Sequence, residues 1–326
     1  MRNVVVATHG HCFDGLCSAV MFTRLLKHLH PGDDLAFTYK SMGYGPGSNG
    51  VDPALLVGDE NAILDFRFSA SPKLTWYFDH HVSAFVTDED RATYAAGATE
   101  GAGRHMFHDG TYGSCTKLIA DISRERFGLD TSGDDVRELV RWADMIDSAN
   151  FPSAEMAVNK AEPVLHLMTV VEHNGNDAYL QAMVPRLLQK PIVEVARSAD
   201  IQAAFAPLEA QQQGFIDLVK KHAEVRGPVV LVDLSPVVVD VAAKFVTYAL
   251  WPESTYSVLL SRSASKVKIS IGYNPWCNIP RTHNIAKICE RHGGGGHPVV
   301  GAISLPAGEI EKAKELARSI ADELGT

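Results

Sequence analysis

The sequence has no long hydrophobic run. A membrane-spanning helix needs about 20 mostly apolar residues, and none of the 326 residues lies in such a stretch. Near the N-terminus, the apolar residues 4–6 form too short a run for a signal peptide, and no small-residue cleavage site follows. We therefore expect no membrane span and no secretory leader, and we expect this run to form a first β-strand.

Cysteine is scarce and its spacing is uninformative. The chain has five cysteines, an odd number, and no two of them are spaced as Cys-x-x-Cys. A disulfide framework or a structural zinc ribbon would need paired cysteines, so the sequence argues against both. The cytoplasm is the compartment that this usage favours.

Basic residues are too few for a broad nucleic-acid surface. The net charge is −9, which argues against a surface for duplex DNA. A short oligonucleotide in a local pocket is still compatible, because bound cations can supply the positive charge there. Apolar residues make up 46% and charged residues 21%, as in an ordinary globular protein. Since domains usually contain about 100–200 residues, we expect two of them.

The first half of the chain alternates short apolar runs with amphipathic segments. This alternation predicts an α/β domain with a mostly parallel sheet flanked by helices. Strands are predicted at 3–8, 35–39, 62–65 and 74–78, and helices at 15–29, 114–127 and 134–146. Residues 45–50 match Gly-x-Gly-x-x-Gly by letters, but no helix follows, so we interpret them as a loop.

The second half mixes hairpin-like and helical patterns. It predicts a smaller C-terminal α/β domain with a mixed sheet. Strands are predicted at 228–234, 256–260, 266–271 and 299–305, and helices at 239–250, 284–291 and 309–324. The predicted domains are 1–190, a helical linker at 191–227, and 228–326.

Histidine and aspartate gather where the predicted strands end. His9 follows the first strand, Asp65 ends the third, and Asp79-His80-His81 follow the fourth. The carboxyl ends of parallel strands meet at one edge of a sheet, where ligands bind. Imidazole and carboxylate together suit Mn²⁺, Zn²⁺ or Fe²⁺, and oxygen-rich sites favour Mn²⁺ or Mg²⁺. The pattern therefore predicts a metal site at this edge.

Two further segments carry candidate residues. Asp144 and Asp147 lie among apolar residues near the end of a predicted helix, where carboxylates oppose the helix dipole, so a nearby cation would help to explain them. Residues 293–296 are four glycines followed by His297. Such a run can present successive backbone N–H groups to an anion. It lacks the Gly-Lys-Ser/Thr of a Walker A loop.

Together these motifs resemble the DHH phosphoesterase superfamily. The resemblance rests on Asp79-His80-His81, His9 with Asp14-Gly15, Asp65-Phe66 and Ala143-Asp144, and the glycine run resembles the associated DHHA1 domain. The superfamily includes RecJ-like exonucleases, nanoRNase/pAp phosphatases, cyclic-dinucleotide phosphodiesterases and family II pyrophosphatases. It implies two divalent cations, Mn²⁺ before Mg²⁺, Zn²⁺ or Fe²⁺. The implied metal ligands are His9, Asp14, Asp65, His80 and Asp144, with Asp65 as the candidate bridge.

The same resemblance implies the other roles. Asp79 would orient the imidazole of His80, and His81 would face the scissile phosphate as a hydrogen-bond donor or acid. A last set would hold the phosphate or base distal to the scissile bond: Gly294, Gly295, Gly296 and His297. Arg67 is open between contacting a phosphate and an exposed salt bridge.

The sequence departs from the family pattern at Cys12. The family commonly has Asp-x-Asp where this chain has Cys12-Phe13-Asp14. Three interpretations are open: a soft ligand that favours Zn²⁺ or Fe²⁺, a first metal that is weak or held by His11 instead, or a cysteine with no role in the site.

The predicted function is hydrolysis of short linear nucleotides, such as dinucleotides or pAp-like molecules, in a cleft between the two domains. A homodimer is left open. Two alternatives stand beside this hypothesis. One is a polyphosphate or pyrophosphate hydrolase, and the other is a nucleotide-binding regulator whose metal site is weakened at Cys12.

Overall fold

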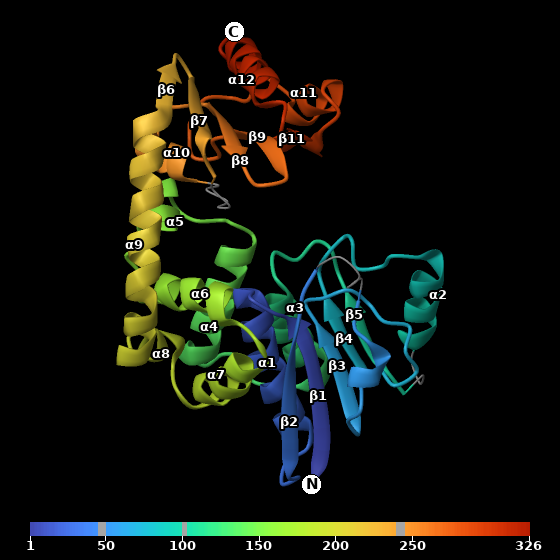
Figure 1. The fold of residues 1–326 in the computed structure, drawn as a ribbon. Coiled ribbons are helices and arrows are strands. Elements are labelled where there is room, and N and C mark those ends of the chain that lie inside the picture. The colour runs from blue at the N-terminus through green and yellow to red at the C-terminus, as the bar shows by residue number, and fades with distance from the viewer. Residues whose placement is uncertain (45–49, 100–102, 239–244) are drawn as a thin grey trace. The chain divides into compact units, whose positions relative to one another are not determined.

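The computed structural model describes residues 1–44, 50–99, 103–238 and 245–326 (Figure 1). By internal packing the chain divides into two compact units. The first comprises Met1–Asn150 and Glu162–Leu208, and the second comprises Phe151–Ala161 and Glu209–Thr326. Within the described ranges, no helix combines the length and the apolar character needed to cross a membrane.

The first unit contains a five-stranded sheet in which every pair of neighbouring strands is parallel. The strand order is β2-β1-β3-β4-β5. Their bounds are β1 Arg2–His9, β2 Leu35–Met42, β3 Glu60–Leu64, β4 Trp76–Asp79 and β5 His105–His108. The predicted mostly parallel sheet is confirmed. The order also places β1, β3 and β4 side by side, so their carboxyl ends are neighbours.

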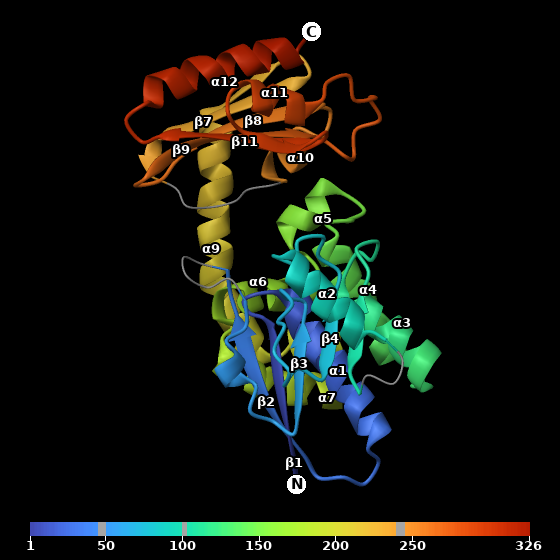
Figure 2. The same ribbon diagram turned by 90° about the vertical axis from the view of Figure 1, so that its right-hand side faces the viewer.

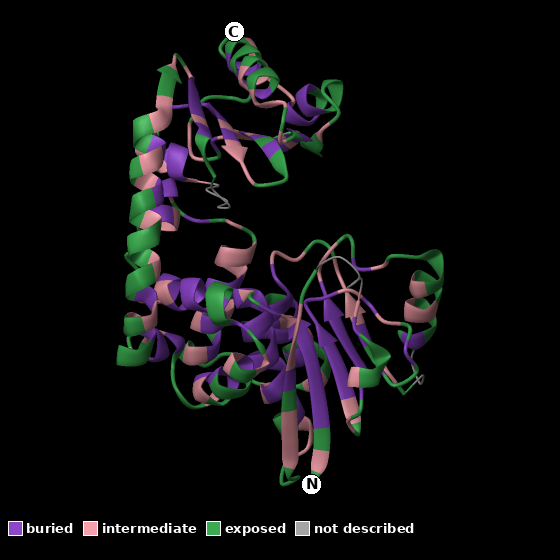
Figure 3. Cartoon of the chain, viewed as in Figure 1, coloured by how far each residue is buried: buried purple, intermediate pink, exposed green. Residues whose placement is uncertain are grey.

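Helices and loops cover both faces of this sheet. On one face, α1 (Phe13–Leu29) packs against β1 and β3, and α3 (Cys115–Phe127) packs against β4. Figure 3 shows these strands as largely buried, which explains why β1 is a continuous apolar run instead of an alternating one. The unit also contains η1 Pro53–Leu55, α2 Asp88–Gly97, α4 Asp134–Asp147, α6 Pro163–Asn174, α7 Asp177–Gln189, α8 Ile192–Ala196 and the start of α9 Ala199–His222.

The second unit contains a six-stranded mixed sheet with the order β10-β11-β9-β8-β7-β6. Only β7 and β8 pair in parallel within it. Its elements are α5 Ala154–Asn159, β6 Ala223–Arg226, β7 Val229–Val238, α10 Val246–Leu250, β8 Tyr256–Arg262, β9 Lys266–Tyr273, α11 Ile285–Arg291, β10 Gly295–His297, β11 Val300–Pro306 and α12 Ile310–Leu324. The predicted mixed-sheet α/β domain is confirmed.

Alternate residues of β7 enter two different cores. Val229 and Leu231 pack with residues of α11 and α12, which lie together over one face of the sheet in Figure 2. Val230 and Val232 pack on the opposite face with Val158 of α5 and with the C-terminal part of α9. This second core explains why Phe151–Ala161 belongs to the second unit, whereas the sequence prediction placed these residues in 1–190.

The elements that were not predicted from the sequence include α2 and β5, whose residues carry little apolar signal. In α2 only Gly97 is buried, and the helix starts at a capping box between Thr87 and Asp90. The strand β5 has only four residues, two of them histidines, and its pairing with β4 makes it a strand. The predicted helix at 239–250 is confirmed for Val246–Leu250. Residues 239–244, and residues 45–49 of the predicted loop, lie outside the described ranges.

Candidate metal centre

The ends of β1, β3 and β4 bring metal-ligating side chains together. Among the described residues there are three groups of potential metal ligands. Within each group, the donor atoms all lie within 4.8 Å of one another. The groups are His9, Cys12 and Asp65; Asp65, His80 and His81; and Asp14, His80 and Asp147. Asp65 and His80 each belong to two groups, so the three form one continuous set of donors, which we call the donor cluster.

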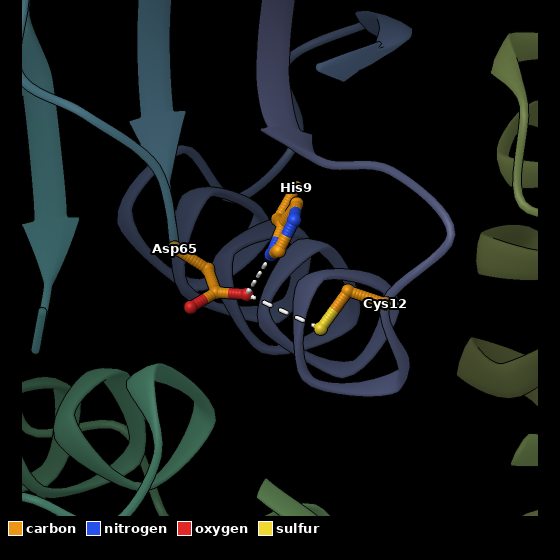
Figure 4. A group of neighbouring side chains, drawn as sticks. All are labelled: His9, Cys12 and Asp65. Carbon is orange, nitrogen blue, oxygen red and sulfur yellow. Dashed lines mark hydrogen bonds and ion pairs between the residues drawn. The ribbon is translucent and has the colours of Figure 1, made fainter. Parts of the chain in front are cut away.

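Asp65 connects the first two groups. Figure 4 shows the first of them, in which one oxygen of Asp65 faces both His9 and Cys12. Asp65 Oδ2 lies 3.7 Å from His9 Nδ1 and 3.6 Å from Cys12 Sγ. The side chain is 1% exposed, and the backbone has a φ of 54°, a left-handed conformation that non-glycine residues rarely adopt. Residues held in such conformations are concentrated at functional sites. The structure therefore places Cys12 beside two predicted ligands, in favour of a ligand role.

His80 connects the second and third groups. Its Nε2 lies 3.2 Å from Asp147 Oδ2, 3.5 Å from Asp65 Oδ1 and 3.9 Å from Asp14 Oδ2. Its Nδ1 lies 3.0 Å from the carbonyl oxygen of Tyr112, so Nδ1–H donates to that oxygen and Nε2 faces the carboxylates. A histidine that ligates a metal commonly donates its other ring N–H in this way.

Two buried atoms of the donor cluster fit the role of metal ligands. Asp65 Oδ1 and His80 Nε2 are buried, and neither makes a hydrogen bond to another residue in the part of the chain that the structure describes. Buried polar atoms normally have a partner, so each orphaned atom calls for an explanation. The donor cluster as a whole offers imidazole, carboxylate and thiol donors, and this set suits a divalent transition metal.

The acids repel one another in the metal-free chain. Burial, together with the neighbouring Asp65 and Asp147 carboxylates, raises the pKa of Asp14 well above its usual value. Burial and the same carboxylates also raise the pKa of the Cys12 thiol. For His80, burial alone would lower the pKa, but Asp147 and Asp65 outweigh burial and raise it to about 11. His80 therefore carries the positive charge among these acids when no metal is bound.

This pKa predicts that protons and metal compete. Below pH 11 the metal-free His80 keeps its proton, and ligation through Nε2 requires that proton to leave. Metal affinity therefore rises with pH, and we expect the dissociation constant for Mn²⁺ to fall by up to about tenfold per pH unit near neutrality. Isothermal titration calorimetry at several pH values, in buffers of different ionisation enthalpy, measures both the affinity and the released proton. A pH-independent affinity with no proton release would contradict the assignment of His80.

Asp14 and Asp144 have different surroundings from one another. Asp14 accepts hydrogen bonds from the backbone N–H groups of Cys115 (2.7 Å) and Thr116 (3.1 Å), at the start of α3. Asp144 instead contacts Ser114 Oγ (3.4 Å) and Lys117 Nζ (3.5 Å) and belongs to none of the three donor groups. Its predicted metal role is thus not favoured by the geometry. Asp147, one turn further along α4, belongs to the third donor group instead.

The imidazole held by Asp79 is that of His81, whereas the sequence analysis predicted that of His80. Asp79 Oδ1 accepts a hydrogen bond from His81 Nδ1 at 2.7 Å, whereas His80 Nδ1 pairs with the carbonyl of Tyr112. The strand ends at Asp79 and the chain turns, which brings the second histidine back onto the carboxylate. The hydrogen bond that His81 donates to Asp79 outweighs burial and raises the pKa of His81. His81 is about one-third exposed, and its imidazole is set to donate from Nε2.

Two residues whose roles were open from the sequence lie beside the donor cluster. His11 Nδ1 lies 3.1 Å from the carbonyl oxygen of Glu172, and His11 is in none of the three groups. Arg67 lies over the ring of Tyr44, 4.9 Å from its centroid, and makes no ion pair with a described residue. Tyr44 also contacts the ring of His9, at a centroid distance of 5.3 Å. Tyr44 carries no motif signal and was missed from the sequence.

The glycine run is partly explained by packing. A Cβ on Gly294 would lie 2.2 Å from the carbonyl oxygen of Ala302, and Gly296 has a φ of 155°. The N–H groups of Gly293 and Gly294 donate to carbonyls of α11, so these two are not free for an anion. Gly295, Gly296 and His297 form the exposed edge strand β10. Substrate binding by Gly294, Gly295, Gly296 and His297 stays a prediction.

No family model and no curated protein matches the sequence of this chain. Among solved structures, the pGpG-specific phosphodiesterase PggH from Vibrio cholerae is 17% identical, with a TM-score of 0.64 over 100% of both chains. An exopolyphosphatase-related protein from Bacteroides fragilis is 14% identical, with a TM-score of 0.51 over 100% of this chain and 94% of that one.

A third structure, RecJ from Thermus thermophilus in complex with Mn²⁺, is 11% identical, with a TM-score of 0.52. The match covers 99% of this chain and 52% of RecJ. Identities this low establish similarity of fold. The chain therefore has the fold of these three structures, and this fold agrees with the two α/β domains that the sequence analysis predicted.

Proposed function

We propose that the chain is a metal-dependent phosphoesterase that hydrolyses short linear nucleotides. The observation that carries the proposal is the position of Asp65 and His80, each of which belongs to two of the three donor groups and so connects them. Two divalent cations, most readily Mn²⁺, would be held by His9, Cys12, Asp14, Asp65, His80 and Asp147. Such a pair would activate a water and neutralise charge on the phosphoryl group.

The protein's own side chains supply the remaining functions. His81 keeps its proton because Asp79 holds its Nδ1–H, so Nε2–H can donate to a phosphate oxygen or to the leaving group. The guanidinium of Arg67 has no carboxylate partner among the described residues, and it is available for a substrate phosphate. Gly295, Gly296 and His297 would hold the distal part of the nucleotide.

The substrate class is supported by PggH, which is described as specific for pGpG and shares the fold over the whole chain. A dinucleotide also agrees with the net charge of −9, which argues against a broad basic surface for duplex DNA. A second candidate, polyphosphate hydrolysis, is favoured by the fold shared with the exopolyphosphatase-related protein. A cytoplasmic location and a homodimer stay predictions.

The test uses purified protein with Mn²⁺ and three substrates: pGpG, pAp and polyphosphate. We expect turnover of a nucleotide, and we expect the Asp79→Ala/His80→Ala variant to lose more than about 100-fold in rate, because it removes a ligand and the support of His81. The matched control is His28→Ala/Asp130→Ala, which changes the same residue types at exposed positions of the first unit.

Three outcomes would contradict the proposal. Equal product from the wild type and the Asp79→Ala/His80→Ala variant would show that the site is wrong. Turnover of polyphosphate alone would favour the second candidate. Tight binding of pGpG without turnover would favour a nucleotide-binding regulator.

A further inference from the structure

Tyr77 lies at the centre of the first unit and beside the proposed site. It is on β4, two residues before Asp79, so both side chains point to the same face of the strand. The residue is fully buried, and its ring packs against Phe68 at a centroid distance of 5.1 Å in a T-shaped arrangement. The apolar ring belongs to the core, whereas the hydroxyl group needs a polar partner there.

The partner of that hydroxyl is the carboxylate of Asp79. Tyr77 Oη lies 3.0 Å from Asp79 Oδ2 and 3.2 Å from the carbonyl oxygen of Phe66. A hydroxyl has one proton to donate, and a hydrogen bond to an ionised acceptor is the stronger of the two. Tyr77 therefore donates to Asp79 Oδ2.

The two oxygens of Asp79 have different partners. Oδ1 accepts from the backbone N–H groups of His80 (2.9 Å) and His81 (3.2 Å) and from His81 Nδ1 (2.7 Å). Among the described residues, only Tyr77 donates to Oδ2. Asp79 is 0% exposed, so loss of the tyrosine hydroxyl would leave a buried carboxylate oxygen without a donor. We would then expect the carboxylate to rotate toward another donor, away from the orientation in which its Oδ1 accepts from His81 Nδ1.

We infer that Tyr77 is a positioning residue, whose hydroxyl fixes Asp79 so that Asp79 in turn directs His81 Nε2 toward the substrate. The inference rests on the proposed function for its kinetic consequence, but the hydrogen-bonded chain Tyr77–Asp79–His81 can be observed without turnover. No motif in the sequence points to Tyr77, because a tyrosine inside an apolar strand is usually a core residue.

The test replaces Tyr77 with phenylalanine, which keeps the ring and removes the hydroxyl. With pGpG and saturating Mn²⁺, we expect kcat to fall by about tenfold while KM changes by less than about twofold, as for loss of an outer partner of a catalytic group. The matched control is Tyr39→Phe. Tyr39 is 2% exposed, and its hydroxyl bonds Thr23 Oγ1 at 2.8 Å, so this variant loses a similar buried bond away from Asp79.

A double-mutant cycle separates positioning from general destabilisation. If Tyr77 acts through His81, Tyr77→Phe should lower kcat in the wild type but have no further effect in a His81→Ala background. A merely structural role would lower kcat by the same factor in both backgrounds. That result, or an unchanged kcat in Tyr77→Phe, would overturn the inference.

Proton NMR of the metal-free protein gives a readout that is independent of activity. A His81 Nδ1–H proton held against a buried carboxylate should give a downfield resonance that His81→Ala abolishes. We expect Tyr77→Phe to shift or broaden it and Tyr39→Phe to leave it unchanged. An unshifted resonance in Tyr77→Phe would refute the chain even if the wild type proved to be inactive. Inactivity of the wild type would by itself contradict only the proposed function.

Discussion

Replacing Asp65 with asparagine is expected to abolish tight Mn²⁺ binding and to lower kcat/KM for pGpG by about 1000-fold or more, because the substitution removes the carboxylate shared by two donor groups. Asparagine has nearly the same shape and tolerates the left-handed φ of 54° at this position, so the fold should be retained. Equilibrium dialysis with Mn²⁺ and steady-state kinetics measure the two losses.

The control for Asp65→Asn is Asp109→Asn. Asp109 Oδ1 accepts hydrogen bonds from the backbone N–H and the hydroxyl of Thr111, which an asparagine oxygen can also accept. This variant should bind Mn²⁺ and turn over substrate like the wild type. If Asp65→Asn also binds Mn²⁺ with unchanged affinity, Asp65 is not a ligand and the proposed centre is wrong.

Asp147→Asn is expected to weaken Mn²⁺ binding by about 100-fold, whereas Asp144→Asn should change it by less than about threefold. The reason is geometric. Asp147 Oδ2 lies 3.2 Å from His80 Nε2, but Asp144 lies against Lys117 in a pair that is partly exposed. The two variants make the same chemical change three residues apart on α4, so each serves as the control for the other.

Calorimetric titration of both variants with Mn²⁺, together with thermal unfolding of the metal-free proteins, separates ligand loss from destabilisation. A large loss in Asp144→Asn with little change in Asp147→Asn would restore the ligand that the sequence motif suggested.

The ends of the strands could be predicted because the signal for a buried parallel strand lies in a short, continuous segment of the sequence. Buried parallel strands are runs of apolar residues, so β1, β3 and β4 could be recognised, and the polar residues that follow them could be assigned to one edge of the sheet. His9, Asp65 and His80 do come together there. The strand order, which makes these three ends neighbours, depends on long-range pairing that no single segment encodes.

The choice between Asp144 and Asp147 was beyond the sequence. Both carboxylates are near the C-terminal end of α4, and residues three apart share nearly the same side of a helix. Which of the two reaches His80 depends on how the helix is rotated about its axis. That rotation is set when its apolar side, with Leu139 and Ala143, packs in the core. Asp79 presented a similar problem, because its partner depends on the path of the chain after the strand.

The position of His80 has a consequence for the stability of the protein before it binds a metal. A protonated imidazole among three carboxylates is a built-in counter-ion. Because the folded chain raises its pKa from the ordinary value of 6.5 to about 11, this proton contributes stability that is complete below pH 6.5 and is lost as the pH rises through about 11. Zinc fingers, by contrast, are unfolded without metal. We therefore expect the metal-free chain to fold, with metal loading as a separate, later event.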